Sequence, residues 1–217
     1  MGGEVIGYEE VSLGTSDYTT ILQKVRAAKP DVFISAQFAA DAVALLKQCY
    51  ETGLNKEMTI FSSFITNVVA KGIPPQALEG VYAMHYFYYD LAAFEDKEVA
   101  KSAAEFTELY RAKYRTPPDS YATIAYTAYS EMFRGFEASG SFEPKKVSAI
   151  LMANKGQFTC VKGPARWRED HAAVYKYAGF LVQGKGPGEQ KNEWDLFKVV
   201  GYQGDDAVMP TLKSLGY

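Results

Sequence analysis

Residues 30–53, PDVFISAQFAADAVALLKQCYETG, contain in one run the features that decide the fold. Pro30 ends any preceding helix, and residues 31–35 are β-branched and aromatic without polar alternation, which is typical of a strand buried on both faces. The apolar residues of 41–52 then recur at helical spacing, and Gly53 ends that helix as a C-cap. A buried strand followed at once by an amphipathic helix predicts a parallel sheet covered by helices.

The same alternation extends over both sides of this run. Before residue 90 the pattern predicts a strand at 5–8, a helix at 18–29, a strand at 58–61, a helix at 66–71 and a strand at 80–88. After residue 90 it predicts helices at 96–114, 121–135 and 145–152, strands at 158–161, 174–183 and 194–200, a turn-rich stretch at 162–171, a loop at 184–188 and a short helix near 210–215. The fold class expected from this order is α/β with a doubly wound parallel sheet.

Composition excludes several classes of function. The 217 residues are 47% apolar and 23% charged, and the net charge of −3 comes without a basic cluster, so neither nucleic acid nor an anionic membrane is an expected partner. No apolar run approaches the ~20 residues of a membrane span, and the start at residues 1–3 lacks the features of a secretory signal. Cys49 and Cys160 lie far apart without CxxC spacing, which favours two buried thiols over a disulfide or a metal site.

Catalytic motifs are also absent from the sequence. It contains no GxSxG elbow, no GxxxxGK[ST] loop and no GxGxxG turn. The only histidines, His85 and His171, are far apart, and neither has the carboxylate or cysteine spacing of a metal set. We therefore expect a binding protein without a cofactor rather than an enzyme.

Three segments in series resemble one known family. They are LGTSDYTTILQKVRAAKPDVFISAQFAADAVALLKQCYETGL at 13–54, AEFTELYRAKYRTPPDSYATIAYTAYSEMFRGFEASGS at 104–141 and FTCVKGPARWREDHAAVYKYAGFLVQ at 158–183. Their order is similar to that in type I periplasmic binding proteins of the leucine/isoleucine/valine-receptor type, which deliver solutes to ABC transporters. Each motif alone is weak, and the order of the three makes the resemblance specific.

The resemblance implies two α/β lobes that close on a ligand like a clamp. Residues 4–88 correspond to one lobe without its first strand and helix, residues 89–188 to part of the other lobe, and residues 189–217 to a tail returning toward the first lobe. The remaining N-terminal lobe of the family has no counterpart upstream of Glu4. An incomplete sheet leaves unpaired edges and uncovered apolar surface, so a homodimer or a domain-swapped assembly is expected to complete it.

Ligands of open α/β sheets bind at the carboxyl ends of the strands, which places the expected site in three loops. The candidate ligand-binding residues are Gln37, Phe38, Ala39, Ser62, Ser63, Phe64, Tyr86, Tyr88 and Tyr121. Phe64 stands where the resemblance implies an acidic residue for a ligand ammonium group, which favours an aromatic or apolar acid, or an amide, over a free α-amino acid. Core packing of the aromatic residues and helix capping by the polar ones fit the same positions.

The resemblance implies a periplasmic receptor that carries a small organic molecule (an amino acid, an amide or an aromatic acid) to an ABC transporter permease. A ligand-sensing regulatory domain of the same fold is the alternative, and a fragment that binds nothing by itself is a third.

Overall fold

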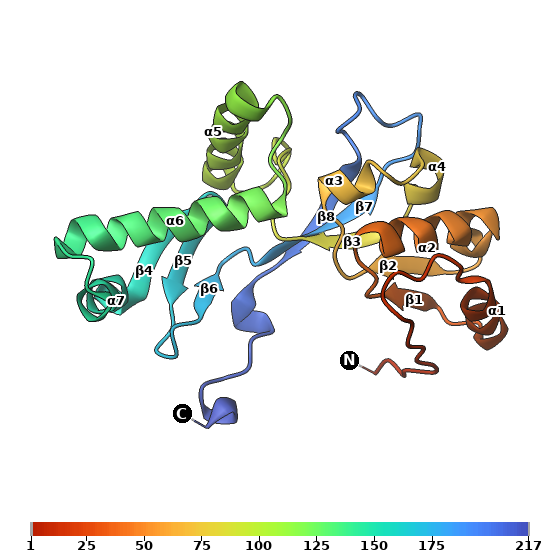
Figure 1. Ribbon diagram of the computed structural model, residues 1–217, viewed down its shortest axis with the longest axis horizontal. Helices are drawn as coiled ribbons and strands as arrows, with labels where there is room; N and C mark the ends of the chain where they lie inside the picture. Colours follow the sequence, from red (N-terminus) through yellow and green to blue (C-terminus); the bar gives the residue numbers. More distant parts are fainter. Residues whose placement is uncertain (1, 217) are drawn as a thin grey trace. The chain divides into compact units, whose positions relative to one another are not determined.

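The computed structural model describes residues 2–216, which divide into two compact units (Figure 1). Unit 1 contains the chain up to His85 together with Leu181–Val200, and unit 2 contains Tyr86–Phe180 together with the residues from Gly201 onward. The chain therefore passes between the units after His85, after Phe180 and after Val200. Neither unit is continuous in sequence.

Most of unit 1 is a sheet with strand order β1-β2-β3-β7-β8 and its covering helices. The strands β1, β2 and β3 pair in parallel, with Ser35 opposite Ser62 and Ser62 opposite Ala83, which confirms the parallel α/β fold class. In chain order the elements are α1 (Thr19–Ala28), β1 (Val32–Ser35), α2 (Ala39–Glu51), the 3₁₀ helix η1 (Leu54–Lys56), β2 (Thr59–Ser62), α3 (Asn67–Ala70), α4 (Pro75–Leu78), β3 (Tyr82–His85), β7 (Gly179–Gly184) and β8 (Phe197–Gln203).

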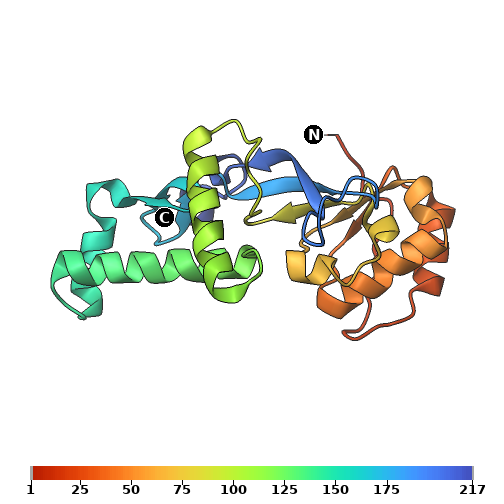
Figure 2. The same ribbon diagram turned by 90° about the horizontal axis from the view of Figure 1, so that it is seen from above.

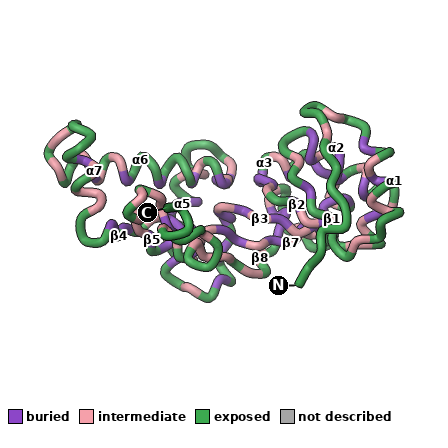
Figure 3. The backbone as a smooth tube through the Cα atoms, turned by 90° about the horizontal axis from the view of Figure 1, so that it is seen from below, coloured by how far each residue is buried: buried purple, intermediate pink, exposed green. Residues whose placement is uncertain are grey.

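The core of unit 1 lies between α2 and the strands. Leu45, Leu46 and Cys49 of α2 are buried, and so are the inward residues of β3 and β7, which are purple in Figure 3. Burying one leucine contributes about 1.5–3 kcal/mol, so the helical spacing of these residues accounts for much of the packing of α2. Cys49 and Cys160 are both free thiols.

Strand β1 corrects the prediction of burial on both faces. It is the edge strand of the sheet, and Val32 and Ile34 remain 47% and 65% exposed, whereas Ser35 on the opposite face is buried. Alternate residues of a strand point to opposite faces, so one apolar face of β1 is open to solvent. The predicted strand at 5–8 is also wrong, because residues 2–10 have no regular structure and are exposed throughout (Figure 3).

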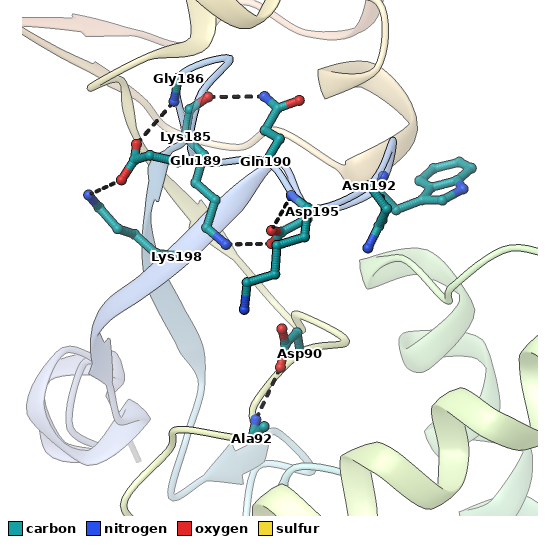
Figure 4. A network of polar contacts seen from close by, with 11 residues as sticks. Asp90, Ala92, Lys185, Gly186, Glu189, Gln190, Asn192, Asp195 and Lys198 are labelled. Carbon is teal, nitrogen blue, oxygen red and sulfur yellow. Dashed lines mark hydrogen bonds and ion pairs between the residues drawn. The ribbon is translucent and has the colours of Figure 1, made fainter.

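Polar contacts hold the loop between β7 and β8, as Figure 4 shows. The Lys185 ammonium forms an ion pair with the buried Asp195 carboxylate, which also accepts a hydrogen bond from the Lys191 backbone N–H at 3.0 Å. Glu189 accepts hydrogen bonds from the Gly186 N–H and the Lys198 ammonium at 3.1 and 3.3 Å. These contacts give the predicted glycine-rich loop a defined conformation.

Unit 2 combines long helices with an antiparallel sheet of order β4-β5-β6, and α5 runs across α6 in Figure 2. The sequence predicts turns at 162–171, but β5 forms there and pairs with both neighbours. In chain order the elements are α5 (Lys97–Tyr114), α6 (Ser120–Ser139), α7 (Pro144–Met152), the 3₁₀ helix η2 (Asn154–Gly156), β4 (Gln157–Cys160), β5 (Gly163–Trp167), β6 (Ala173–Tyr175), and the 3₁₀ helices η3 (Asp205–Ala207) and η4 (Lys213–Leu215).

Helix α6 has an unusual distribution of polarity. Its buried residues include Thr123, Thr127 and Glu131, whereas Tyr129 and Phe133 are exposed. The Glu131 carboxylate accepts hydrogen bonds from the Arg134 guanidinium at 2.6 and 2.8 Å and from the Trp167 indole N–H at 3.0 Å, which ties α6 to β5. Tyr129 and Phe133 therefore give unit 2 an apolar face that is open to solvent.

Candidate functional site

The loops that follow β1 and β2 lie side by side in unit 1. Ser35 and Ser62 end the two strands opposite each other, and the Ser63 N–H donates a hydrogen bond to the Ser35 carbonyl at 2.8 Å. The candidate residues of both loops therefore meet at the carboxyl edge of the parallel sheet, which is where such sheets bind ligands.

An aromatic pair joins the two loops. The rings of Phe38 and Phe64 are stacked, with centroids 6.3 Å apart and planes inclined by 15°. Phe38 is 45% exposed and Phe64 is half-buried, so neither ring is sealed in the core. Aromatic rings prefer offset-stacked or edge-on partners, and this pair forms an apolar surface that is partly accessible to solvent.

Polar groups lie beside this pair. The Gln37 side-chain oxygen accepts a hydrogen bond from the Tyr18 hydroxyl at 3.4 Å, and the Gln37 backbone N–H donates to the Ser35 hydroxyl at 3.2 Å. Burial raises the pKa of Tyr18 above its ordinary value of 10.0. The Ser62 hydroxyl is buried and has no hydrogen-bond partner among residues 2–216, while Ser63 is exposed.

The single carboxylate at the start of α2 is turned inward. Asp41 is buried, and its carboxylate accepts a hydrogen bond from the Gly14 N–H at 2.9 Å. That bond fixes the loop before α1 against the first turn of α2. Asp41 therefore serves the packing of the loop.

Ala39 adopts a left-handed backbone conformation at the start of α2, with φ of +50°. A residue with a Cβ pays roughly 1–2 kcal/mol for this conformation. Backbone strain of this kind concentrates at functional sites, where the surrounding structure holds it in place. The strained residue lies directly after Phe38 in the loop that carries the aromatic pair.

The three candidate tyrosines belong to unit 2. Tyr86 packs edge-on against Tyr175 at 5.7 Å, and burial together with a hydrogen bond to Tyr175 raises the pKa of Tyr86. Tyr88 is buried with its ring 5.0 Å from Tyr89, and Tyr121 is half exposed on α6. The structure thus brings together the candidates after β1 and β2, and it places the tyrosines in a different unit.

Sequence reasoning missed Tyr18 as part of this site. Tyr18 precedes α1 and looks like an ordinary first-turn residue, yet it is buried and its hydroxyl reaches Gln37 from a neighbouring element. Hydrogen bonds between Gln48 of α2 and the segment before α1 hold Tyr18 in this place, so no local pattern could have indicated the contact.

Comparison with known proteins agrees with this fold. The profile of the family described as "Periplasmic binding protein" matches residues 1–187. Leu/Ile/Val-binding protein homolog 1 of Brucella abortus (strain 2308) is 27% identical over 162 residues, which are 75% of this chain and 41% of that protein.

Two solved structures show the same fold. A periplasmic binding protein from Burkholderia mallei matches with a TM-score of 0.81 and 22% identity, over 98% of this chain and 54% of that one. A solute-binding protein of an ABC transporter from R. palustris, solved in complex with benzoate, matches with a TM-score of 0.69 and 19% identity, over 88% and 48%. The chain therefore spans about half the length of these relatives.

Across residues 2–216, none of the helices combines the length and the apolar character needed to cross a membrane. The family profile covers most of the chain, the curated relatives are binding proteins, and the solved neighbours share the parallel sheet on which the candidate loops lie. The chain belongs to the periplasmic binding protein family.

Proposed function

We propose that this chain is the ligand-binding part of a periplasmic receptor that delivers a planar aromatic or apolar acid, or an amide, to the permease of an ABC transporter. The stacked and accessible pair Phe38–Phe64 carries the proposal, because it sets an apolar surface at the carboxyl edge of the sheet. The buried Ser62 hydroxyl and the exposed Ser63 hydroxyl supply polar groups beside it. Pockets of this composition, mostly apolar with a few polar groups, suit small organic ligands.

The proposed ligand class rests on the two loops offering no available carboxylate for a ligand ammonium group. The inward-turned Asp41 is engaged by Gly14, and Phe64 rather than a carboxylate stands in the second loop. An α-amino acid would bury its ammonium group without an anionic partner there, and an unpaired buried charge is costly. The benzoate complex of the R. palustris relative supports an aromatic acid as the first ligand to test.

Thermal unfolding of the chain with benzoate, benzamide and leucine tests the ligand class. A ligand that binds only the folded state at a hundred times its Kd adds about 2.7 kcal/mol of stability, so benzoate or benzamide should raise the Tm. Leucine should leave the Tm unchanged. A rise with leucine alone, or no rise with any of the three, contradicts the proposal.

Three variants locate the site. Phe38→Leu and Phe64→Leu keep the apolar character and remove the ring, so each should abolish most of the benzoate shift. Phe133→Leu removes an aromatic ring that is exposed in unit 2, and it is the matched control that should retain the shift. Equal losses in all three variants would place the ligand elsewhere.

Self-association belongs to the same proposal. The open edge and open apolar face of β1 support a second copy that completes the sheet, either by simple dimerisation or by exchange of an element. An unpaired strand edge readily accepts another strand, and Val32 and Ile34 supply the apolar contact.

A further inference from the structure

Lys162 is a buried lysine in unit 2 whose position is set by a tight turn. It lies between β4 and β5, where Cys160 pairs with Gly163. Gly163 has a φ of +95°, and a Cβ there would approach Val99 Cγ2 to 2.8 Å, so the turn requires glycine. Lys162, the residue before this glycine, is only 1% exposed.

Backbone carbonyls and aromatic rings surround the Lys162 ammonium group. Its Nζ donates hydrogen bonds to the Ala178 and Tyr86 carbonyls at 2.6 and 3.4 Å. The same atom lies 3.2 Å from the ring centroid of Tyr86 and 4.4 Å from that of Tyr175. Carbonyl dipoles and ring faces stabilise a cation, but less than the water that burial removes.

No carboxylate among residues 2–216 forms an ion pair with Lys162. The titratable groups that face it are the two tyrosines, the Cys160 thiol and the Asp205 carboxylate. Burial lowers the pKa of Lys162 from 10.5 to about 7, while Cys160 and Asp205 oppose that shift. The buried amine is therefore able to change its charge near neutral pH.

Lys162 contacts segments of unit 2 that lie next to the points where the chain crosses between the units. Tyr86 is the first residue of unit 2, and Ala178 lies just before Phe180, the last residue before the chain returns to unit 1. The Ala178 N–H donates a hydrogen bond to the Gln203 carbonyl at 2.8 Å, and Gln203 follows the third crossing. Lys162 therefore sits where all three crossing segments are held together within unit 2.

We propose that Lys162 makes the packing of these crossing segments sensitive to pH. When the amine takes up a proton, conformations in which it reaches water become favoured, and the contacts of the crossing segments open. Proton uptake favours opening because a lysine whose pKa is lowered in the packed state binds protons more strongly in the open state. As the pH falls from 10 to 7, the equilibrium constant for local opening should rise about tenfold for each pH unit, and below pH 7 it should level off.

Amide hydrogen exchange of Ala178 measures this opening. The protection factor of its N–H, corrected for the intrinsic exchange rate, should fall roughly tenfold from pH 8.5 to pH 7.5 in the unmodified chain. Lys162→Met keeps the length of the apolar stem and removes the amine, so its protection factor should not depend on pH. Lys198→Met, which removes a partly exposed lysine of β8, is the control that should behave like the unmodified chain.

A ¹³C NMR titration of the Lys162 side chain tests the proposal without a substitution. The Cε resonance should titrate with a midpoint near 7 rather than near 10.5. A midpoint above 10 overturns the proposal, and so does the same pH dependence of Ala178 exchange in Lys162→Met and in the unmodified chain.

Discussion

At the scale of single residues, Ala39 carries backbone strain in the loop between β1 and α2. A φ of +50° is strained for alanine but not for glycine. The hydrogen bond from the Asp41 N–H to the Phe38 carbonyl fixes the turn around Ala39. The consequence is a loop whose shape is imposed by its surroundings, with Phe38 held against Phe64.

Replacing Ala39 with glycine should therefore stabilise the chain. We expect Ala39→Gly to raise the free energy of unfolding by up to about 1 kcal/mol, because the relief of left-handed strain exceeds the added entropy of the unfolded chain. Urea denaturation provides the measurement. Ala40→Gly, one residue further into the helix, should lower stability, and similar losses in both variants would contradict the strain argument.

Asp96 links a helix cap to the acid stability of unit 2. Its carboxylate accepts hydrogen bonds from the Tyr177 hydroxyl at 2.8 Å, the Lys176 ammonium at 3.0 Å and the Val99 N–H at 3.3 Å. The Tyr177 and Lys176 bonds, in that order, lower the pKa of Asp96 to about 2. A carboxylate with a lowered pKa contributes stability above its ordinary pKa of 3.8 and loses it as the pH falls toward 2.

Asp96→Asn should reveal this contribution in the pH dependence of the Tm. Asparagine caps helices about as well as aspartate, so the variant removes the charge and retains the cap of α5. We expect its Tm to be lower than that of the unmodified chain at pH 7 and equal to it near pH 2. A constant difference across that range would show that the effect is not ionic.

At the scale of elements, Gly135 sets the distance between α6 and α7. A Cβ at this position would lie 2.7 Å from Val147 Cγ1 and 3.3 Å from Leu151 Cδ2. Val147 is buried and β-branched, so it has little freedom to move away. Glycine inside a long helix is therefore explained by close packing.

Gly135→Ala should destabilise the chain although alanine is the better helix former. Overpacking costs about 1–3 kcal/mol, against a gain in helix propensity of about 1 kcal/mol. The same substitution in a Val147→Ala background should cost less, because the clashing methyl groups are gone. Urea denaturation of the two single variants and the double variant tests the coupling, and additive effects would exclude the clash.

Elements with a strong local signal could be predicted from the sequence. Helix α5 forms where the pattern places it, with Asp96 as its cap, and β1 and β2 form within one residue of the predicted runs. Strand β5 could not be predicted, because Gly163 and Pro164 read as a turn and only pairing with β4 and β6 makes them a strand. The prediction of a strand at residues 5–8 is wrong for the opposite reason, since their β-branched residues favour a strand but form none.

Some residues of the candidate site could likewise be placed from the local sequence pattern, and others could not. The strand-to-helix alternation sufficed to place Gln37, Phe38, Ser63 and Phe64 in adjacent loops, because parallel strands bring their carboxyl ends to one edge. The roles of Tyr86 and Tyr88 depend on partners far away in sequence, such as Tyr175, and no local pattern contains that information.

At the scale of the whole molecule, each unit presents an uncovered apolar face. In unit 1 it consists of Val32 and Ile34 on β1, and in unit 2 it includes Tyr129, Phe133 and Phe142, which the ring contacts through Phe136 connect. Contiguous exposed apolar patches are typical of interaction surfaces and ligand grooves.

The chain should therefore self-associate at micromolar concentration. Sedimentation velocity should show a dimer or a larger species, and Ile34→Lys should weaken it if β1 forms the contact, because a lysine on an edge strand opposes pairing. Phe133→Lys tests the face of α6 in the same way. A folded monomer at these concentrations would refute assembly through either face.

The discontinuity of unit 1 has a consequence for synthesis on the ribosome. Strand β3 pairs with β7, but residues 86–178 must be translated between them, which takes roughly 5–20 s at typical elongation rates. During that interval the nascent sheet has an open edge at β3 as well as at β1, and both invite chaperones or misassembly. A stop codon just before β7 would thus release a chain in which the β3 edge has no partner strand.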